Sequence, residues 1–363
     1  MTQASPRTLG IDARMLFSSG IGTVIQNVLR RLPSERWRVT IMVADENAAQ
    51  WVRQNRPEAR TVLVPSPIYS CAEQWAVPRA VGRVDLFWSP HYNIPLFYPG
   101  RLVATVHDVA HLARPDFFPG LAKQAYARLL LQGVRFRCRK VVCVSEFSAK
   151  ELVRLTGFPP SRLRVIPNGV DQAWFEQLPP SREEVPYFVY VGNVKPNKNL
   201  LRLLRAFGRV MDRMPHRLRI VGRRDGFITG DPQVELQATR LGDRVQFTGW
   251  LGEGLLRQTV AQATALVFPS LYEGFGLPVL EAMACGCPVL SSSATSLPEV
   301  GGSAAVYFNP ESVEEIGGAL IKASTWTTEE RNRLVQKGRE RASLFSWDKS
   351  VDSLLAVFAE ASA

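Results

Sequence analysis

Two glutamates eight positions apart carry the clearest chemical pattern in this 363-residue chain. Glu273 and Glu281 lie in Ser270-Leu-Tyr-Glu-Gly-Phe-Gly-Leu-Pro-Val-Leu-Glu281, just after the apolar run 265–268. Pro278 suits the start of a helix, where unpaired backbone N–H groups favour an anion. A carboxylate accepts two hydroxyl hydrogen bonds, which suits sugars and ribose. Spacing alone equally allows a solvated loop residue and a favourable charge in the first helical turn.

A lysine stands at a second expected strand–turn–helix junction, Val191-Gly-Asn-Val-Lys-Pro-Asn-Lys-Asn199. Asn197 or Asn199 could cap the helix. Lys198 at the helix start would help to hold a phosphate, but it opposes the helix dipole when no anion is bound. This conflict favours a phosphate-binding role only in combination with the glutamate motif, because a flexible surface lysine is otherwise the simpler interpretation.

Two weaker signals lie in the first half. Gly20 and Gly22 fall between the first expected strand and helix, where glycine lets backbone approach a ligand. Ile25 occupies the third glycine position of G-x-G-x-x-G, so the dinucleotide fingerprint fails. His107 and Asp108 end an apolar strand, where α/β folds place functional side chains. A structural histidine is an equally good interpretation of His107.

Other chemistries lack their residue patterns. No two aspartates are separated by one residue, so a D-x-D site for a metal-bound diphosphate is absent. The motifs H-E-x-x-H and G-x-S-x-G and a Walker A lysine are absent as well. Cys285 and Cys287 lack partners for a tetrahedral zinc site. We therefore expect neither a metal nor a cofactor.

The elements that must position these residues alternate along the chain. The expected strands are 8–12, 38–43, 60–64, 85–88, 102–106, 141–144, 187–191, 217–221, 244–247, 265–268, 288–290 and 305–308, with helices such as 22–31 and 120–137 between them. This alternation predicts parallel sheets built from βαβ units. Residues 179–186 form the best linker, since they are rich in proline and charge. We expect two Rossmann-like halves, with the active site in the cleft between them at the carboxyl ends of the strands.

Composition indicates a globular protein, with 46% hydrophobic and 21% charged residues. The apolar runs are too short to cross a bilayer, and the polar start leads straight into a strand pattern, so we expect no signal peptide. Five scattered cysteines favour a reducing compartment. We therefore expect a cytoplasmic protein.

The net charge of +11 belongs to the first half. Residues 1–172 contain 23 Lys and Arg against 12 Asp and Glu, whereas residues 173–363 contain 21 of each. This asymmetry suggests an anionic partner, such as nucleic acid, a membrane surface or a phosphorylated substrate, although a solvated basic surface explains it too. No recognised nucleic-acid-binding motif accompanies the charge. Residues 128–140, with five basic and several apolar residues, are the best candidate for contact with an anionic membrane, and packing of their apolar side in the core is the alternative.

Together these residues resemble the retaining glycosyltransferases of family 4, which have the GT-B fold. The resemblance rests on the E-x7-E block 269–289, on Val165-Ile-Pro-Asn-Gly-Val-Asp171, on Gly192 to Asn199, on Val144-Ser-Glu-Phe-Ser148 and on Phe345-Ser-Trp347. It implies an α/β protein of two Rossmann-like domains facing each other across a cleft. Residues 1–172 would bind the acceptor and residues 173–344 the nucleotide-sugar donor. The final helix, 345–363, would pack back on the first domain.

Carried onto this sequence, the resemblance implies a donor site. Glu273 would contact hydroxyls of the donor sugar, Glu281 would contact the ribose, and Lys198 would hold the diphosphate. The other implied donor contacts are Gly20 and Gly22 in a closing loop, Trp250 and Leu251 near the base, and the backbone of Phe275, Gly276 and Leu277. Asn193 stands where many members of the family have a basic residue. That charge could come from Lys195, Arg223 or Arg224.

The implied reaction is metal-independent hexosyl transfer with retention of anomeric configuration, with His107, Lys198 and Glu273 as catalytic residues. The subfamily resembles bacterial mannosyltransferases of O-antigen, capsule or exopolysaccharide synthesis, so GDP-mannose is the first expectation for the donor. The acceptor would be a glycan or a polyprenyl-diphosphate-linked glycan at the inner face of the membrane, without nucleic acid as a partner. A sugar-nucleotide epimerase, a glycan phosphorylase and a nucleic-acid-binding protein are the alternatives.

Overall fold

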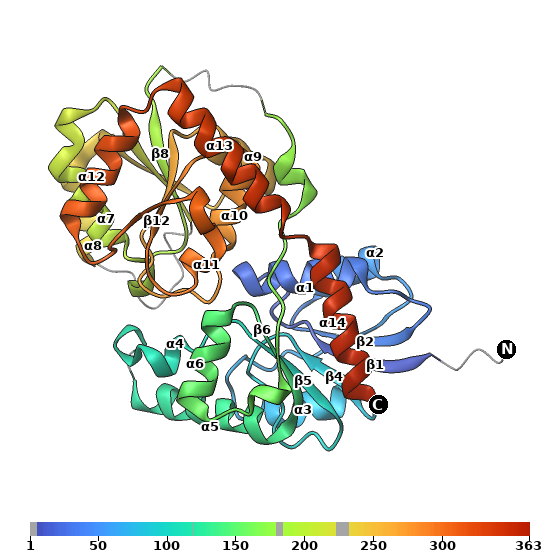
Figure 1. Cartoon of the computed structure of the whole chain (residues 1–363). Coiled ribbons are helices and arrows are strands. Elements are labelled where there is room, and N and C mark those ends of the chain that lie inside the picture. The colour runs from blue at the N-terminus through green and yellow to red at the C-terminus, as the bar shows by residue number, and fades with distance from the viewer. Residues whose placement is uncertain (1–5, 119, 179–183, 223–231) are drawn as a thin grey trace. The chain divides into compact units, whose positions relative to one another are not determined.

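The computed structural model describes residues 6–118, 120–178, 184–222 and 232–363. The chain forms two compact units, Met1–Gly169 with Trp347–Ala363 and Val170–Ser346 (Figure 1). The chain therefore passes from one unit to the other at 169/170 and 346/347, where the sequence predicted 172/173 and 344/345. Residues 179–183 of the predicted linker lie outside the described residues.

The first unit is built on a seven-stranded sheet whose paired strands are all parallel. In spatial order the strands are β3 (Arg60–Leu63), β2 (Trp37–Val43), β1 (Arg7–Asp12), β4 (Leu86–Ser89), β5 (Leu102–Val106), β6 (Cys138–Cys143) and β7 (Leu163–Val165). The strand order reverses between β1 and β4, so the carboxyl ends of these two neighbours border the switch point of the fold. Strand β7 was not predicted, because its three residues are too few to show a pattern.

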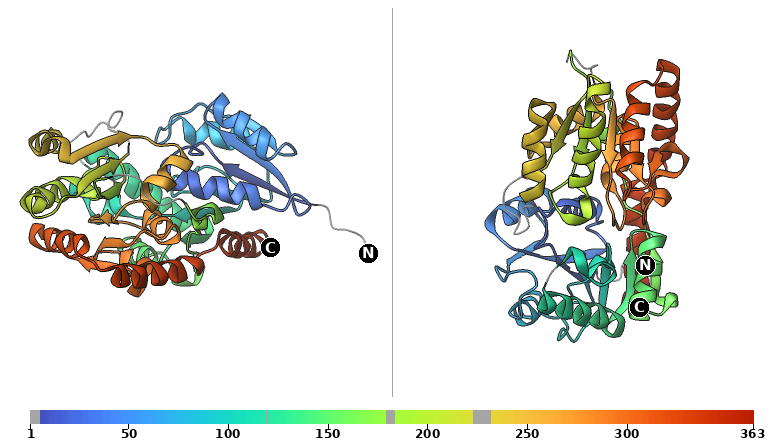
Figure 2. Two further views of the ribbon diagram at one scale, coloured as in Figure 1. Left: turned by 90° about the horizontal axis from the view of Figure 1, so that it is seen from above. Right: turned by 90° about the vertical axis from the view of Figure 1, so that its left-hand side faces the viewer.

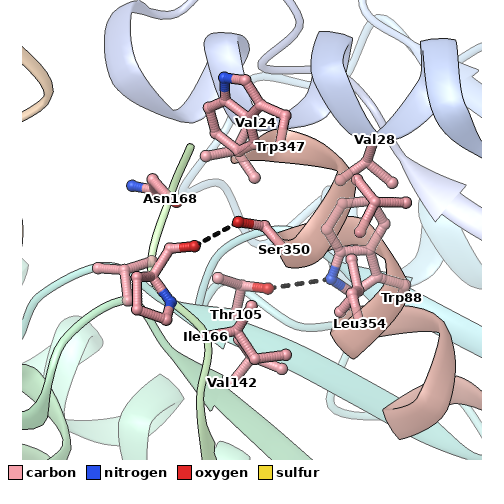
Figure 3. A pocket seen from close by; sticks show the side chains of 13 residues that line it. Val24, Val28, Trp88, Thr105, Val142, Ile166, Asn168, Trp347, Ser350 and Leu354 are labelled. Atoms are coloured by element: carbon pink, nitrogen blue, oxygen red, sulfur yellow. Dashed lines mark hydrogen bonds between the residues drawn. The ribbon is translucent and has the colours of Figure 1, made fainter. Parts of the chain in front are cut away.

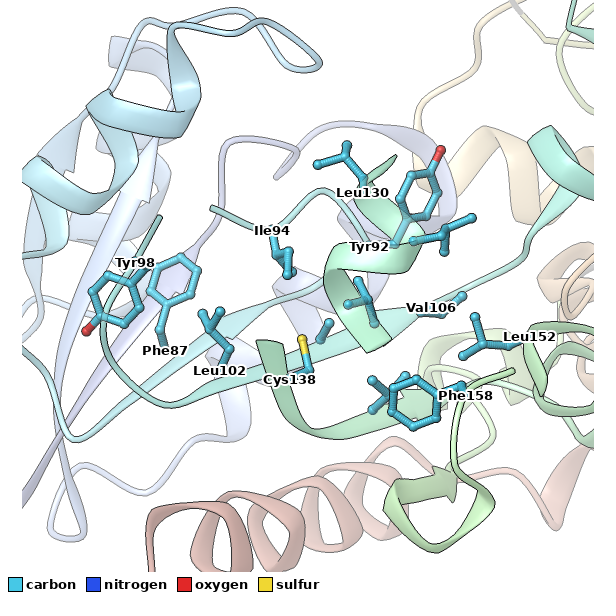
Figure 4. Close-up of a cluster of buried hydrophobic side chains, with 14 of the residues drawn as sticks. Phe87, Tyr92, Ile94, Tyr98, Leu102, Val106, Leu130, Cys138, Leu152 and Phe158 are labelled. Atoms are coloured by element: carbon cyan, nitrogen blue, oxygen red, sulfur yellow. The ribbon is translucent and has the colours of Figure 1, made fainter. Parts of the chain in front are cut away.

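Helices connect the strands of the first unit. They are α1 (Ser19–Arg31), α2 (Glu46–Asn55), α3 (Glu73–Val81), α4 (Ala110–Ala113), α5 (Leu121–Arg137) and α6 (Glu146–Thr156). On one side of the sheet the core includes Phe87, Val106 and Leu130, together with Leu152 and Phe158 (Figure 4). Burial of these apolar side chains drives the helices onto the sheet.

The last helix, α14 (Trp347–Ser362), belongs to the first unit. The ring of Phe358 lies 6.2 Å from that of Trp37 and 5.6 Å from that of Trp88. Ser350 Oγ donates to the Pro167 carbonyl beside a cavity of about 20 Å³, which has room for about one water molecule (Figure 3).

Basic side chains of the sheet gather at the end of α14. Lys140 and Arg164 pair with Glu360, while Arg101 and Arg139 donate to the Ser362 and Ala361 carbonyls. Cations are favourable at a helix C-terminus because they face its partial negative charge. Part of the positive charge of the first half therefore stabilises this unit itself.

The second unit has a parallel six-stranded sheet. Its order is β10 (Val245–Gly249), β9 (Arg217–Val221), β8 (Tyr187–Val191), β11 (Ala265–Phe268), β12 (Val289–Ser292) and β13 (Val306–Phe308). The helices are α7 (Leu200–Val210), α8 (Pro232–Leu241), α9 (Glu253–Ala261), α10 (Leu277–Ala284), α11 (Leu297–Gly301), α12 (Val313–Ser324) and α13 (Thr328–Ser343). Helices flank both faces of the sheet (Figure 2). The predicted α/β class, with two parallel-sheet halves, is confirmed.

Candidate functional site

Lys198 and Glu273, which are far apart in the sequence, are joined directly in the second unit. The Nζ atom of Lys198 lies 2.5 Å from Oε1 of Glu273, and the two side chains are only 22% and 13% exposed. The same Nζ lies 5.4 Å from the centre of the Phe268 ring. Lys198 follows β8 and Glu273 follows β11, and these strands are neighbours in the sheet. The two strongest sequence motifs therefore meet at the carboxyl edge of one sheet.

Asparagines hold the two loops together. Asn199 adopts a left-handed backbone conformation, with φ of 59°. Its side-chain amide donates to the Pro269 carbonyl (2.9 Å) and the Pro310 carbonyl (2.7 Å). Asn197 accepts the Leu271 N–H at its backbone carbonyl, at 2.8 Å. Asn199, one of the two predicted caps, occupies the N-cap position of α7, but its side chain makes no capping hydrogen bond because its amide binds the neighbouring loops.

The two residues just before α11 hold the loop that carries Glu273. Ser296 Oγ donates to the carbonyls of Glu273 (2.9 Å) and Phe275 (3.0 Å), and Thr295 Oγ1 accepts the Glu273 N–H (3.1 Å). Gly276, with φ of 113°, precedes α10, and a Cβ atom there would lie 2.6 Å from Leu297 Cδ2. The positive φ and the close contact both favour glycine at this turn. The turn leads from the loop that carries Glu273 directly into α10, whose N-terminus carries a partial positive charge.

Glu281 lies one turn into α10, as predicted, and is partly buried. Burial raises the pKa of its carboxyl group to about 7, and the negative charge of Glu253 adds to this effect. Among the described residues its carboxyl group has no hydrogen-bond partner. A partly buried carboxylate without a partner is a good acceptor for the hydroxyls of a ligand.

The remaining predicted donor contacts of this unit lie on loops. Asn193 is in the turn after β8, where its carbonyl accepts from Tyr190 Oη at 3.3 Å. Trp250 is exposed just after β10, followed by the partly buried Leu251. Lys195 opens the short 3₁₀ turn that Lys198 ends. Arg223 and Arg224 lie outside the described residues.

His107, Gly20 and Gly22 belong to the first unit. His107 directly follows β5, and its Nε2 lies 2.8 Å from the Pro90 carbonyl, which places the ring proton on that nitrogen. Burial lowers the pKa of His107, so the ring is neutral at pH 7. The predicted glycine loop was wrong, because α1 already begins at Ser19. Gly22 instead lets the helix approach the chain before it, since a Cβ atom would lie 2.5 Å from the Leu16 carbonyl oxygen.

Sequence reasoning missed a buried charged network in the first unit. Arg14 donates to both carboxylate oxygens of Asp12, at 2.8 and 2.7 Å, and to Glu73 Oε2, at 2.9 Å. All three side chains are buried. The Asp12–Arg14 spacing at the end of the first strand was visible in the sequence, but the third partner comes from α3.

Known protein families match most of the chain. The family model described as Glycosyltransferase Family 4 matches residues 18–174, and the model described as Glycosyl transferases group 1 matches residues 185–325. O-antigen chain mannosyltransferase B of Escherichia coli is 31% identical over 278 residues, which is 71% of each chain. O-antigen chain mannosyltransferase RfbU of Salmonella typhimurium is 31% identical over 231 residues, covering 63% of this chain and 62% of that protein.

Solved glycosyltransferases share the fold. The structure of Anabaena Alr3699/HepE in complex with UDP and glucose has a TM-score of 0.79 at 17% identity, covering 98% of this chain and 99% of that one. WaaG, a glycosyltransferase involved in lipopolysaccharide biosynthesis, has a TM-score of 0.76 at 16% identity, covering 96% and 99%. These likenesses confirm the GT-B fold.

The two matched family models and the identity to O-antigen chain mannosyltransferase B show that this chain is a glycosyltransferase. The chain belongs to glycosyltransferase family 4, as its sequence predicted. Within the described ranges, no cluster of three or more His, Cys, Asp or Glu side chains could hold a metal ion, and no helix is long and apolar enough to cross a bilayer.

Proposed function

We propose that this glycosyltransferase moves mannose from GDP-mannose to a glycan acceptor in the synthesis of a cell-surface polysaccharide, with retention of configuration. The observation that carries the proposal is the 31% identity to O-antigen chain mannosyltransferase B. A second mannosyltransferase, the MMP alpha-(1->4)-mannosyltransferase of Mycolicibacterium hassiacum, is 30% identical over 272 residues, covering 72% of this chain and 65% of that protein.

The geometry of the second unit supports a nucleotide-sugar donor. In the proposed complex, Lys198 Nζ holds the diphosphate, Glu273 accepts hydrogen bonds from hydroxyls of the donor sugar, and Glu281 accepts them from the ribose. The ion pair keeps Lys198 and Glu273 side by side before the donor arrives. Prepositioned groups of this kind lower the barrier because they need no reorganisation during the reaction.

In the proposed reaction, the bond between the anomeric carbon and the leaving phosphate oxygen breaks. The acceptor hydroxyl forms the new bond on the same face, and its proton passes to the leaving phosphate. Lys198 and the start of α10 stabilise the charge that develops on the diphosphate. Metal independence remains part of this proposal, since a lysine and a helix start supply the positive charge.

A panel of sugar nucleotides tests the donor. GDP-mannose is compared with other GDP- and UDP-sugars by hydrolysis and by thermal shift, because a bound donor raises the melting temperature. The proposal expects the largest shift and the fastest turnover with GDP-mannose. Turnover of UDP-sugars alone would contradict the proposed donor, while absence of binding to every sugar nucleotide would contradict the donor site itself.

A lipid-linked acceptor would bring the first unit to a membrane, and α5 is the surface we propose for that contact. Leu129 and Phe136, seven residues apart on one face of α5, are 56% and 72% exposed. Leu130, Leu131 and Val134 are fully buried, as the core-packing alternative expected for the apolar side of this segment. Exposed apolar residues beside basic ones favour an anionic bilayer surface.

Four of the five basic residues of 128–140, namely Arg135, Arg137, Arg139 and Lys140, have partners within the protein. Arg135 donates to the Thr156 carbonyl, Arg137 to the Leu96 and Tyr98 carbonyls, and Lys140 pairs with Glu360. Replacing them would therefore disturb the fold. The sharper test is Leu129→Ser with Phe136→Ser in co-sedimentation with anionic vesicles, with the equally exposed Leu236→Ser as control. The proposed contact is contradicted if the wild type does not bind anionic vesicles. It is also contradicted if the double variant binds them as well as the wild type does.

A further inference from the structure

The switch point of the first sheet carries polar groups that the proposed donor site does not use. Strands β1 and β4 are neighbours there, and ligands of open α/β sheets bind at such a point, beyond the carboxyl ends of the strands. Asp12 is the last residue of β1 and Arg14 follows it, while His91 and Asn93 follow β4. His107, directly after β5, has its Nε2 atom 2.8 Å from the carbonyl of Pro90, the residue before His91, so the end of β5 lies nearby.

The buried network fixes the orientation of Asn93. Glu73 Oε2 binds Arg14, and Glu73 Oε1 accepts from Asn93 Nδ2 at 2.7 Å. A carboxylate beside arginine accepts only, so the nitrogen of the amide faces Glu73 and the Asn93 Oδ1 atom faces away. Tyr126 also donates to Glu73, at 3.2 Å, and completes the support.

Asn93 in turn fixes the proton on His91. The backbone N–H of Asn93 donates to His91 Nδ1 at 3.0 Å, so the neutral imidazole carries its proton on Nε2. Both residues are 2% exposed. Among the described residues, neither His91 Nε2 nor Asn93 Oδ1 has a hydrogen-bond partner. Buried polar groups are normally paired. An unpaired donor on His91 and an unpaired acceptor on Asn93 therefore indicate that a hydrogen-bonding partner is missing.

Tyr69 is the exposed residue next to this pair. Its ring centre lies 6.3 Å from those of His91 and Tyr92, and the side chain is 46% exposed. Its backbone φ of 66° is left-handed, which is strained for a bulky residue. The other non-glycine residues with positive φ in the described chain include Asn199 and Thr295, which both hold the loops of the donor site. Such strain gathers at ligand sites.

We propose that His91 and Asn93 bind one hydroxyl of a pyranose ring of the acceptor, with Tyr69 packing against the ring as an acceptor-specificity residue. A hydroxyl matches both atoms, because its oxygen accepts from Nε2–H while its proton is donated to Oδ1. A fully ionised phosphate or a phosphodiester has no proton for Oδ1, and the carboxylates of Asp12 and Glu73 oppose its negative charge. Both atoms are shielded from solvent, so Tyr69 moves aside when the sugar enters. This inference rests on the proposed sugar-transfer function.

Two reciprocal variants of His91 test the hydroxyl contact. His91→Asn keeps an acceptor for the Asn93 N–H but lacks a donor at the Nε2 position, whereas His91→Gln keeps a donor there and loses that internal acceptor. Tyr69→Ala removes the ring, and Phe97→Ala, an exposed aromatic of the loop that carries His91, is the control. Circular dichroism and melting temperature show whether each variant is folded, and Tyr69→Ala still tests the site if a His91 variant is not.

The probes are methyl glycosides of mannose, glucose, galactose, N-acetylglucosamine and rhamnose, offered with the donor that the wild type turns over. We expect His91→Asn and Tyr69→Ala to raise the acceptor KM by about tenfold or more, the effect of one buried hydrogen bond or ring contact. His91→Gln has a smaller effect, and Phe97→Ala has none. The donor KM and the hydrolysis without acceptor stay unchanged in all variants.

If His91→Asn and Tyr69→Ala both keep the acceptor KM of the wild type, the proposal is overturned. Lack of transfer to every methyl pyranoside, while donor hydrolysis continues, would overturn the pyranose site and leave the donor function standing. If no sugar nucleotide is bound or hydrolysed at all, the proposed function itself fails, which is a different result.

Discussion

Replacing Glu281 by glutamine should stabilise the protein at alkaline pH and weaken its donor binding. The carboxyl group has its pKa raised from 4.5 to about 7, first by burial and second by the charge of Glu253. Between these pH values the folded protein holds a proton that the unfolded chain has released, so stability falls as pH rises. Above pH 7 the buried charge lowers the free energy of unfolding by its full amount, and below pH 4.5 this loss of stability vanishes.

The size of this effect follows from the shift. A shift of one pKa unit corresponds to about 1.4 kcal/mol, so the change from 4.5 to about 7 sets an upper bound of about 3 kcal/mol at pH 8. Glu281→Gln should therefore raise the melting temperature of the unliganded protein at pH 8 and leave it nearly unchanged at pH 4.5. Glu253→Gln is the matched control, with a smaller increase, because Glu281 stays buried.

The donor should respond in the opposite direction. The ionised carboxylate accepts the ribose hydroxyls, so the donor KM of the wild type should rise by about tenfold between pH 8 and pH 6, as the group takes up its proton. Glu281→Gln should show a high donor KM that no longer depends on this pH range. A variant that is less stable than the wild type at pH 8, or a wild-type donor KM that is flat from pH 6 to 8, would refute the reasoning.

Three further predictions concern the same unit. Lys198→Ala should lower kcat/KM by about one to two decades while leaving the protein folded, because a charge-assisted hydrogen bond worth about 1.5–3 kcal/mol is lost; wild-type rates would remove Lys198 from the site. EDTA should leave the transfer rate unchanged, and a strict Mg²⁺ or Mn²⁺ requirement would contradict the metal-independent mechanism. Gly276→Ala should destabilise the protein by about 1–3 kcal/mol in thermal unfolding, since φ of 113° and a Cβ atom 2.6 Å from Leu297 Cδ2 both oppose a side chain. An unchanged melting temperature in this variant would show that the turn before α10 adapts.

Much of the fold was accessible from sequence, because buried parallel strands are short apolar runs between helices. The strands at 102–106, 187–191, 217–221 and 265–268 were predicted with the bounds that the structure has. The start of α1 was missed by three residues, since Ser19 and Gly20 look like loop residues. Their place in a helix depends on tertiary contacts rather than on local preference.

The candidate site was predictable as a set of residues but not as a geometry. Motif spacing places Lys198 and Glu273 after two strands, yet their contact depends on β8 and β11 being neighbours and on loop bonds made by Asn199. The pKa of Glu281 depends on burial, which no local pattern reveals. The network around Glu73 joins four separate segments, so its unpaired atoms on His91 and Asn93 are visible only in the folded protein.

The measurement that tests the central claim most directly is the anomeric configuration of the product made from GDP-mannose. The purified enzyme is incubated with GDP-mannose and an accepted methyl glycoside, and the product is read by proton NMR. We predict release of GDP together with an α-linked mannosyl product, the configuration of the donor. A β-linked product, or no acceptor-dependent release of GDP, would contradict the proposed retaining mannosyl transfer.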